Sequence, residues 1–371
     1  MIRLLRGERF PAILLLVAAA IGLVLANAPV GPSVIAASEA HLGPLTLVHW
    51  VSDFLLALFF FGAAVELQYE LTSGELNSLK RALRPMIAAA GGVVTPIIVY
   101  LVIAGRGETA SGWPVPTATD IAFALGVLAV FGRGLPSAVR VFLLALAIID
   151  DIIGVVFIAV LFTDHVDLRS LGAAILFVVV FGVLSRLSFR PRGALMVVAA
   201  LAAWWFVHAS GVHATIAGVL LGLAVRQHEG LRARTALEAW INGLVLPLFA
   251  FCAALIVIPR VPLGQLSLAF WGIAVALPVG KVVGITLLGW LTMRGAPSAI
   301  RLPDLVAAAC LGGIGFTVSL LLANLAFASD AALRDQAVLG VLAGSAVSLV
   351  LAAITVSLRA STHRRETSSP T

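Results

Sequence analysis

The sequence predicts an all-α polytopic membrane protein with about twelve transmembrane helices. Hydrophobic residues make up 61% of the chain and charged residues only 11%, whereas a soluble domain carries about 25% charged residues. The hydrophobic residues form twelve apolar segments joined by short connections. Most lysines and arginines lie in alternate connections, which is typical of a chain that crosses a membrane many times.

The expected helices correspond to apolar runs close to the ~20 residues that cross a hydrocarbon core. The first run follows three arginines and ends in an Ala-Asn-Ala sequence at 26–28, which resembles a signal-peptidase site. This run is long for a signal peptide, so we favour a retained helix over a cleaved one. The twelve segments lie near residues 11–29, 50–69, 85–104, 116–131, 138–161, 168–185, 193–208, 211–226, 240–258, 268–290, 302–327 and 335–358.

The positive charges predict the orientation of the helices. One set of alternate connections holds Arg3, Arg6, Arg9, Lys80, Arg81, Arg84, Arg133, Arg140, Arg186, Arg190, Arg192, Arg226, Arg232, Arg234, Arg294, Arg301, Arg359, Arg364 and Arg365. The other set holds only Arg106, Arg169, Arg260 and Arg334. Because cytoplasmic loops carry the excess of Lys and Arg, both termini are expected in the cytoplasm, with residues 360–371 as a tail. The loops also account for the net charge of +6 without a nucleic-acid partner.

Two adjacent carboxylates, Asp150 and Asp151, lie in an apolar run that extends from about residue 139 to 162. One charged side chain at the centre of a membrane helix costs roughly 2.5–3.5 kcal/mol on insertion scales. A soluble helix with a wet face would explain the pair only if its flanks were polar, and they are apolar on all sides. The pair therefore indicates an ion or proton site inside a bilayer.

Two segments are interrupted at membrane depth. Residues 114–120 contain two prolines before an apolar run, and residues 312–317 contain three glycines within one. Each interruption alone could be a loop or a close-packing patch of glycines, but interrupted helices in matching positions of two halves are typical of transporter sites. Residues 85–161 and 268–358 would form two such units of opposite topology, which predicts an inverted repeat.

Few other ionisable groups lie deep within the apolar segments, and we single out the cation Lys281 in the middle of the segment 268–290. We expect a carboxylate of the aspartate pair to keep its ammonium charged, the alternative being a lysine that snorkels to an interface. Asp151, with Asp120 and Thr119, could provide oxygen ligands for a small hard cation. Crowded carboxylates also hold protons. The same site would therefore bind either a cation or protons, but not both at once. The remaining embedded groups are Asp53, Glu66, His208 and His213.

Several of these groups could respond to pH. His208 and His213 flank a short turn, and imidazole titrates near neutral pH, although a structural role would account for either. Glu66 and Glu238 lie at expected cytoplasmic helix ends, where they would form an acidic funnel for cations or simply be solvated.

Six stretches match a known family in order and spacing. They are Thr117–Phe131, Leu143–Asp151, Gly211–Gly218, Leu246–Phe251, Gly280–Gly284 and Gly313–Leu320. On these residues the chain resembles the NhaA-type bacterial sodium/proton antiporters, from about residue 47 to 358.

The resemblance implies an electrogenic exchanger that trades cytoplasmic Na⁺ or Li⁺ for external H⁺ across the bacterial inner membrane, for sodium and pH homeostasis. It implies a single transmembrane domain over residues 1–371 with crossed discontinuous helices, and a homodimer formed through a periplasmic β-hairpin within 31–47. The site residues it implies are Asp151 as the main Na⁺ or Li⁺ ligand, Thr119 and Asp120 beside it, Asp150 paired with Lys281, and Glu66, His213 and Glu238 in the pH response.

The chain departs from the family pattern in three places. Ile153-Gly154 stands where Gly-Ala is usual, Cys252 follows the 246–251 stretch where Asn is usual, and Gln68-Tyr69 replaces a basic pair. A sodium-coupled symporter of organic solutes and a regulated channel or sensor are the alternative functions. The chain has no nucleophile–base constellation, zinc signature or phosphate loop, so neither an enzyme nor a cofactor is expected.

Overall fold

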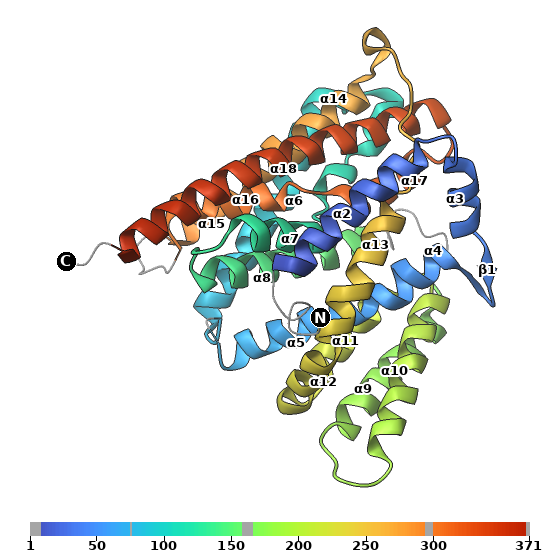
Figure 1. The fold of residues 1–371 in the computed structure, drawn as a ribbon, viewed down its shortest axis with the longest axis vertical. Helices are drawn as coiled ribbons and strands as arrows, with labels where there is room; N and C mark the ends of the chain where they lie inside the picture. Colours follow the sequence, from blue (N-terminus) through green and yellow to red (C-terminus); the bar gives the residue numbers. More distant parts are fainter. Residues whose placement is uncertain (1–8, 75, 158–165, 294–299, 369–371) are drawn as a thin grey trace. The chain divides into compact units, whose positions relative to one another are not determined.

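The computed structural model describes residues 9–74, 76–157, 166–293 and 300–368 (Figure 1). The chain divides into two compact units. Unit 1 comprises Met1–Gly74 and Ile158–Val257, and unit 2 comprises Glu75–Phe157 and Ile258–Thr371. Residues 85–157 and 268–358, which make up nearly all of the two expected repeat units, belong to unit 2. The last four residues of the first repeat unit, 158–161, lie outside the described part of the chain.

Unit 1 is a set of packed helices with one short hairpin. Its elements are α2 (Arg9–Ala26), α3 (Gly31–Ser38), β1 (His41–Leu42), β2 (Leu45–Thr46), α4 (Leu47–His49), η1 (Trp50–Leu55), α5 (Leu56–Thr72), α9 (Leu168–Leu184), α10 (Arg192–Ala209), α11 (Thr215–Ala224), α12 (Gln227–Trp240), η5 (Ile241–Val245) and α13 (Leu246–Ala253). The strands β1 and β2 pair antiparallel, with His41 opposite Thr46. This hairpin lies within residues 31–47, and its role in dimerisation stays a prediction.

All the regular secondary structure in the described residues of unit 2 is helical. Its elements are α6 (Leu79–Ala104), η2 (Gly107–Gly112), η3 (Val115–Thr117), α7 (Ile121–Phe131), α8 (Ser137–Phe157), η6 (Leu263–Gln265), α14 (Leu268–Val275), η7 (Ala276–Gly280), α15 (Lys281–Met293), α16 (Leu302–Gly312), α17 (Phe316–Ala326) and α18 (Ala331–Ser368). The long helix α18, red in Figure 1, packs against α14, α16 and α17. It continues through residue 368, so most of the expected cytoplasmic tail is helical.

The helices have the length and composition of membrane spans. Within the described residues, seven are long and apolar enough to cross a bilayer, and up to nine spans result if each of two bent helix pairs is one span. Apolar side chains such as Val102, Val197 and Leu358 are exposed on them, as expected where lipid replaces water. The protein is therefore an all-α polytopic membrane protein, as predicted.

Small residues let the helices of unit 2 approach closely around the expected site. A Cβ atom on Gly284 of α15 would lie 2.0 Å from the carbonyl oxygen of Gly91 on α6, so only glycine fits this crossing. Close approach at small residues is the usual way in which membrane helices pack. Next to the crossing, Leu146 of α8, Ile285 of α15 and Leu305 of α16 form one buried core. Two of these helices also carry charged residues of the expected site, Asp150 on α8 and Lys281 on α15.

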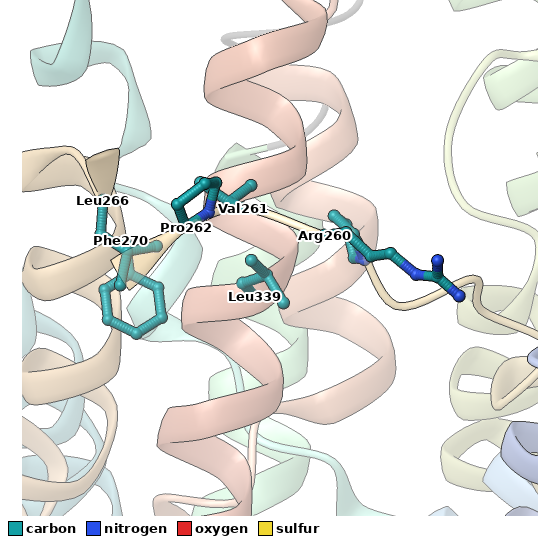
Figure 2. Close-up of a pocket in the computed structure, with 7 residues that line it drawn as sticks. Arg260, Val261, Pro262, Leu266, Phe270 and Leu339 are labelled. Carbon is teal, nitrogen blue, oxygen red and sulfur yellow. The ribbon is translucent and has the colours of Figure 1, made fainter. Parts of the chain in front are cut away.

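A pocket of about 410 Å³ lies at the start of α14 in unit 2 (Figure 2). Its lining residues are Pro259, Arg260, Val261, Pro262, Leu266, Phe270 and Leu339. In the close-up the Arg260 side chain points away from the others. The lining includes none of the predicted site residues.

Candidate functional site

The two interrupted segments contact each other through their backbones. The pair of segments Gly107–Thr117 and Ile121–Phe131 is bent by 50°, and α16 and α17 are bent by 47°. Between the first pair, the amide of Asp120 donates a 2.6 Å hydrogen bond to the carbonyl of Ile314, which lies between the second pair. Non-helical backbone at membrane depth needs such partners because lipid supplies none.

The Asp120 carboxylate caps two helices at once. Its Oδ1 accepts from the amide of Phe123 in the first turn of α7, at 3.2 Å. Its Oδ2 accepts from the amide and the hydroxyl of Thr317 in the first turn of α17, at 3.2 Å and 2.5 Å. Helix N-termini carry partial positive charge, so this buried carboxylate compensates both. The side chain is only 3% exposed.

Lys281, Asp150 and Thr119 form a buried polar cluster next to the breaks. The Lys281 ammonium contacts Asp150 Oδ2, and both side chains are fully buried. The Thr119 hydroxyl lies 3.1 Å from the Lys281 Nζ and 2.7 Å from Asp150 Oδ2. Lys281 therefore does not snorkel to an interface, and it has the carboxylate partner that the sequence suggested.

Thr119 also joins this cluster to the end of α16. Its hydroxyl lies 2.7 Å from the carbonyl oxygen of Gly312, the last residue of that helix. A hydroxyl carries one proton, so Thr119 can donate to Gly312 or to Asp150 but not to both. Which of these two groups accepts the Thr119 proton therefore depends on whether Asp150 itself carries a proton.

One carboxylate oxygen of the cluster has no hydrogen-bond partner in the part of the chain that the structure describes. Asp150 Oδ1 is buried and accepts no hydrogen bond among the described residues. A buried carboxylate oxygen in this state is suited to receive a proton or a cation. Asp151 follows Asp150 in α8, but its side chain lies outside the part of the chain that the structure describes.

Helix α18 supports the second break. The Ser345 hydroxyl accepts a 3.1 Å hydrogen bond from the amide of Phe316, where α17 begins. One turn further along α18, Ser348 faces Gly313 so closely that a Cβ there would lie 2.7 Å from its hydroxyl oxygen. Neither serine stands out in the sequence, because a serine in a membrane helix most often bonds its own backbone.

The three candidates for the pH response all lie in unit 1. Glu66 on α5 forms a 2.7 Å ion pair with Arg234 on α12, and Glu238 follows Arg234 by one helical turn. His213 lies 3.0 Å from the Thr215 hydroxyl. The structure therefore brings Thr119, Asp120, Asp150 and Lys281 together in unit 2 and holds Glu66, Glu238 and His213 in unit 1.

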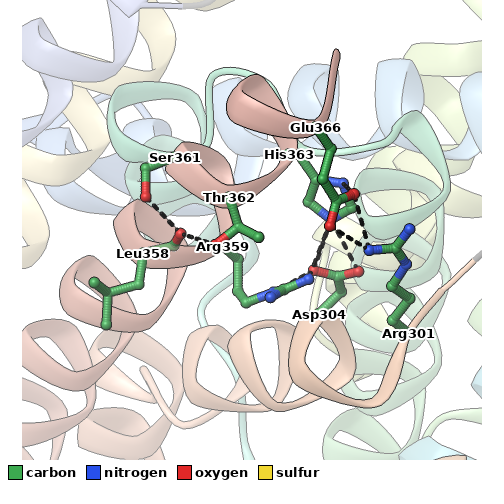
Figure 3. Close-up of polar contacts among 8 residues, drawn as sticks. All are labelled: Arg301, Asp304, Leu358, Arg359, Ser361, Thr362, His363 and Glu366. Carbon is green, nitrogen blue, oxygen red and sulfur yellow. Dashed lines mark hydrogen bonds and ion pairs between the residues drawn. The ribbon is translucent and has the colours of Figure 1, made fainter. Parts of the chain in front are cut away.

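Asp304 is a buried carboxylate that the sequence analysis did not single out. It lies in the first turn of α16 and is fully buried. Arg359 and His363 of α18 bind it, through contacts described below (Figure 3). Asp304 is the one acidic residue of the apolar segment 302–327, and this signal could have revealed it.

Comparison with known proteins identifies the family of this chain. The family model described as Na+/H+ antiporter 1 matches residues 2–356. The chain belongs to this family. A relative named Na(+)/H(+) antiporter NhaA 2, from Clavibacter michiganensis subsp. michiganensis, is 55% identical, with 98% of this chain and 94% of the relative covered.

Two further relatives extend the agreement to other bacteria. The Na(+)/H(+) antiporter NhaA of Tropheryma whipplei is 44% identical over 95% of this chain and 94% of its own length. The Na(+)/H(+) antiporter NhaA 3 of Streptomyces coelicolor is 41% identical over 97% of this chain and 80% of its own length. The NhaA-type resemblance seen in the sequence is thus confirmed, and membership of the Na+/H+ antiporter 1 family implies a multi-pass membrane transporter rather than an enzyme.

Proposed function

We propose that the protein is an electrogenic antiporter that exchanges cytoplasmic Na⁺ or Li⁺ for external H⁺ across the bacterial inner membrane. The observation that carries the proposal is the buried Lys281–Asp150–Thr119 cluster at two helix breaks, in a chain of the Na+/H+ antiporter 1 family. Such an exchange would serve sodium and pH homeostasis.

The transported cation would bind oxygen atoms at the breaks. Carboxylate, hydroxyl and carbonyl oxygens are the ligands that hard cations prefer, and we assign Asp151 as the main ligand with Thr119 and Asp120 beside it. Both oxygens of Asp120 already accept hydrogen bonds from helix N-termini. Its main contribution would then be a fixed negative charge next to the cation, and no resident cofactor would be required.

Proton exchange follows from the hydrogen bonds around Asp150. A proton on Asp150 would let that group donate to Thr119, and Thr119 would then donate to the Gly312 carbonyl 2.7 Å away. Lys281 would lose its charged acceptor at the same time. Proton uptake would thus weaken the Lys281–Asp150 contact and change the hydrogen bonding at the end of α16. Asp150, Asp151 and Lys281 together could release more than one proton for each monovalent cation, which would make exchange electrogenic.

The transport cycle would use the inverted repeat and the two broken helices. The nine candidate spans, together with α8, α9 and α11, would make the expected twelve, and the broken helices would cross at their contacting breaks. With an even number of spans, the arginine-rich connections would lie in the cytoplasm together with both termini. A homodimer would form through the hairpin of β1 and β2. Glu66, His213 and Glu238 would adjust the rate of exchange to pH.

Transport by the purified protein in liposomes tests the proposal. An inward-acidic pH gradient is imposed, Na⁺, Li⁺ or K⁺ is added outside, and a pH-sensitive dye reports proton release. We expect release with Na⁺ or Li⁺, none with K⁺, and loss of the response in Asp151→Asn. The matched control is Asp335→Asn, an exposed aspartate at the start of α18, which should transport like the parent protein.

The outcomes separate the proposal from its alternatives. Release that survives in Asp151→Asn would reject the ligand assignment. A cation flux that ignores the pH gradient would indicate a channel, and no response to any cation would favour a sodium-coupled solute symporter. Repeating the assay with a voltage-sensitive dye tests electrogenicity, because a neutral exchange would generate no potential.

A further inference from the structure

The buried carboxylate of Asp304 ties the start of α16 to the end of α18 (Figure 3). Arg359 donates from its Nε to Asp304 Oδ1 at 2.8 Å. His363 Nε2 lies 3.0 Å and 3.1 Å from the two oxygens of the same carboxylate. A charge buried in this way is retained only with such partners, so these contacts set the position of the first turn of α16 against α18.

The same stretch of α18 also holds the other broken helix. Arg364 donates a 2.7 Å hydrogen bond to the carbonyl of Arg133, two residues after the end of α7. Asp120 lies at the opposite end of α7, and Gly312 lies at the opposite end of α16. The last turns of α18 therefore contact both short helices that meet at the ion site, at the ends remote from it.

Helix α16 can transmit a displacement from Asp304 to the site. Gly312 lies eight residues beyond Asp304, or about 12 Å at 1.5 Å per residue. Every residue from Leu305 to Gly312 is buried except Val306, which is partly exposed. A short, closely packed helix moves as a unit, so a shift at Asp304 would reach the Gly312 carbonyl that Thr119 contacts.

His363 is the histidine of this cluster, and imidazole is the side chain that generally can gain or lose a charge in the physiological pH range. Its Nδ1 lies 3.9 Å from Glu366 Oε2, and Glu366 in turn accepts from Arg301 at 2.8 Å and 2.9 Å. The charged groups facing it are thus Asp304 and Arg301 at the start of α16 and Arg359 and Glu366 on α18; Arg364 points to the end of α7. With a neutral imidazole the two carboxylates balance the two guanidinium groups of Arg301 and Arg359.

We propose that Asp304 is a positioning residue for the exchange site and that His363 makes its hold on α16 dependent on pH. Protonated imidazole has two N–H groups, which can face Asp304 and Glu366 together, whereas neutral imidazole has only one. The contact between α16 and α18 is tightest when His363 is protonated, because its contact with Asp304 is then an ion pair, and it loosens when the imidazole loses its proton. The proposal rests on the proposed function for its effect on transport and on the proposed orientation for placing the cluster at the cytoplasmic face.

The first test is the pH profile of cation-dependent proton exchange in His363→Gln. Glutamine keeps a donor for Asp304 but cannot become charged, so we expect exchange at pH 6 to rise about two-fold or more while exchange at pH 8.5 stays near the parent value. The control is His228→Gln, an exposed histidine at the start of α12 in unit 1, which should leave the profile unchanged. A His363→Gln profile that coincides with that of the parent protein would overturn the proposal.

The second test does not depend on transport. Hydrogen–deuterium exchange of the full-length protein is measured from pH 6 to 8.5, and the protection factors of the α16 amides are corrected for intrinsic rates. We expect protection to fall with pH in the parent protein, to be low and constant in His363→Gln, and to be low in Asp304→Asn. Protection that does not vary with pH in the parent protein would reject the proposed pH-dependent contact between α16 and α18, even if transport is confirmed. If instead the transport assay detects no cation exchange, the proposed function is wrong. The hydrogen–deuterium exchange measurement still shows whether the contact between α16 and α18 depends on pH.

Discussion

Asp120 in one helix break accepts two hydrogen bonds from Thr317 in the other. The two residues are 197 positions apart in the chain, and the carboxylate between them also caps α7. The breaks are thus joined by an anion that two helix N-termini share. This arrangement explains why a buried carboxylate that has no basic partner among the described residues is tolerated at membrane depth.

The hydroxyl of Thr317 should contribute measurably to stability. Thr317→Val keeps the shape of the side chain and removes the 2.5 Å hydrogen bond to Asp120. We expect a loss of about 1–3 kcal/mol, because a bond to a buried charged group is lost, measured as a lower Tm in detergent. Thr317→Ser keeps the hydroxyl and should retain most of the stability. Equal melting temperatures for Thr317→Val and the parent protein would contradict this account.

The buried pair of Lys281 and Asp150 should show strong coupling. Lys281→Met or Asp150→Leu alone leaves one buried charge without its partner and should cost about 3–5 kcal/mol. The double variant leaves neither charge and should be more stable than either single variant, although it should not transport. Thermal unfolding of the three variants provides the comparison. Losses that simply add in the double variant would show that the two side chains do not stabilise each other.

The crossing of α6 and α15 should not accept a side chain. Gly284→Ala would place a Cβ 2.0 Å from the Gly91 carbonyl oxygen, which forces the helices apart and displaces the neighbouring Lys281. We expect a loss of about 1–3 kcal/mol from overpacking, together with weaker exchange. Gly172→Ala on α9 meets no atom within 4 Å and should be tolerated. A Gly284→Ala protein as stable as Gly172→Ala would show that the crossing can relax.

The ion pair of Glu66 and Arg234 should influence the pH dependence of exchange. Neighbouring carboxylates resist ionising together, and Glu70 and Glu238 add negative charge around Glu66. Removing one carboxylate in Glu66→Gln should therefore move the pH profile of exchange towards lower pH. The control is Glu229→Gln, which breaks the 3.2 Å ion pair between Glu229 on α12 and Arg192 on α10. Identical profiles for both variants would remove Glu66 from the pH response.

The sequence was sufficient to single out the buried charged residues next to the two breaks, because charge is rare in apolar segments. Asp150, Asp120 and Lys281 each stand alone or nearly alone against hydrophobic neighbours, and burying a charge in lipid is costly enough to demand a reason. The breaks were visible because prolines or glycines cluster there, and a cluster of such residues disfavours a continuous helix, whereas single prolines such as Pro96 lie inside α6. Asp304 was not predicted because it lies at a helix end next to Arg301, where a charged side chain is expected to be solvated.

What the sequence by itself determined is the all-helical membrane fold, the family, and the buried charges of Asp120, Asp150 and Lys281, because hydrophobicity, motif spacing and charge are properties of the chain. Only the tertiary structure decided which groups are partners. The contacts of Lys281 with Asp150 and Thr119, of Asp120 with Thr317, and of Asp304 with Arg359 and His363 join residues far apart in the chain. Such pairs form where closely packed helices bring polar groups within about 3 Å of each other, and no local pattern in the sequence encodes that distance.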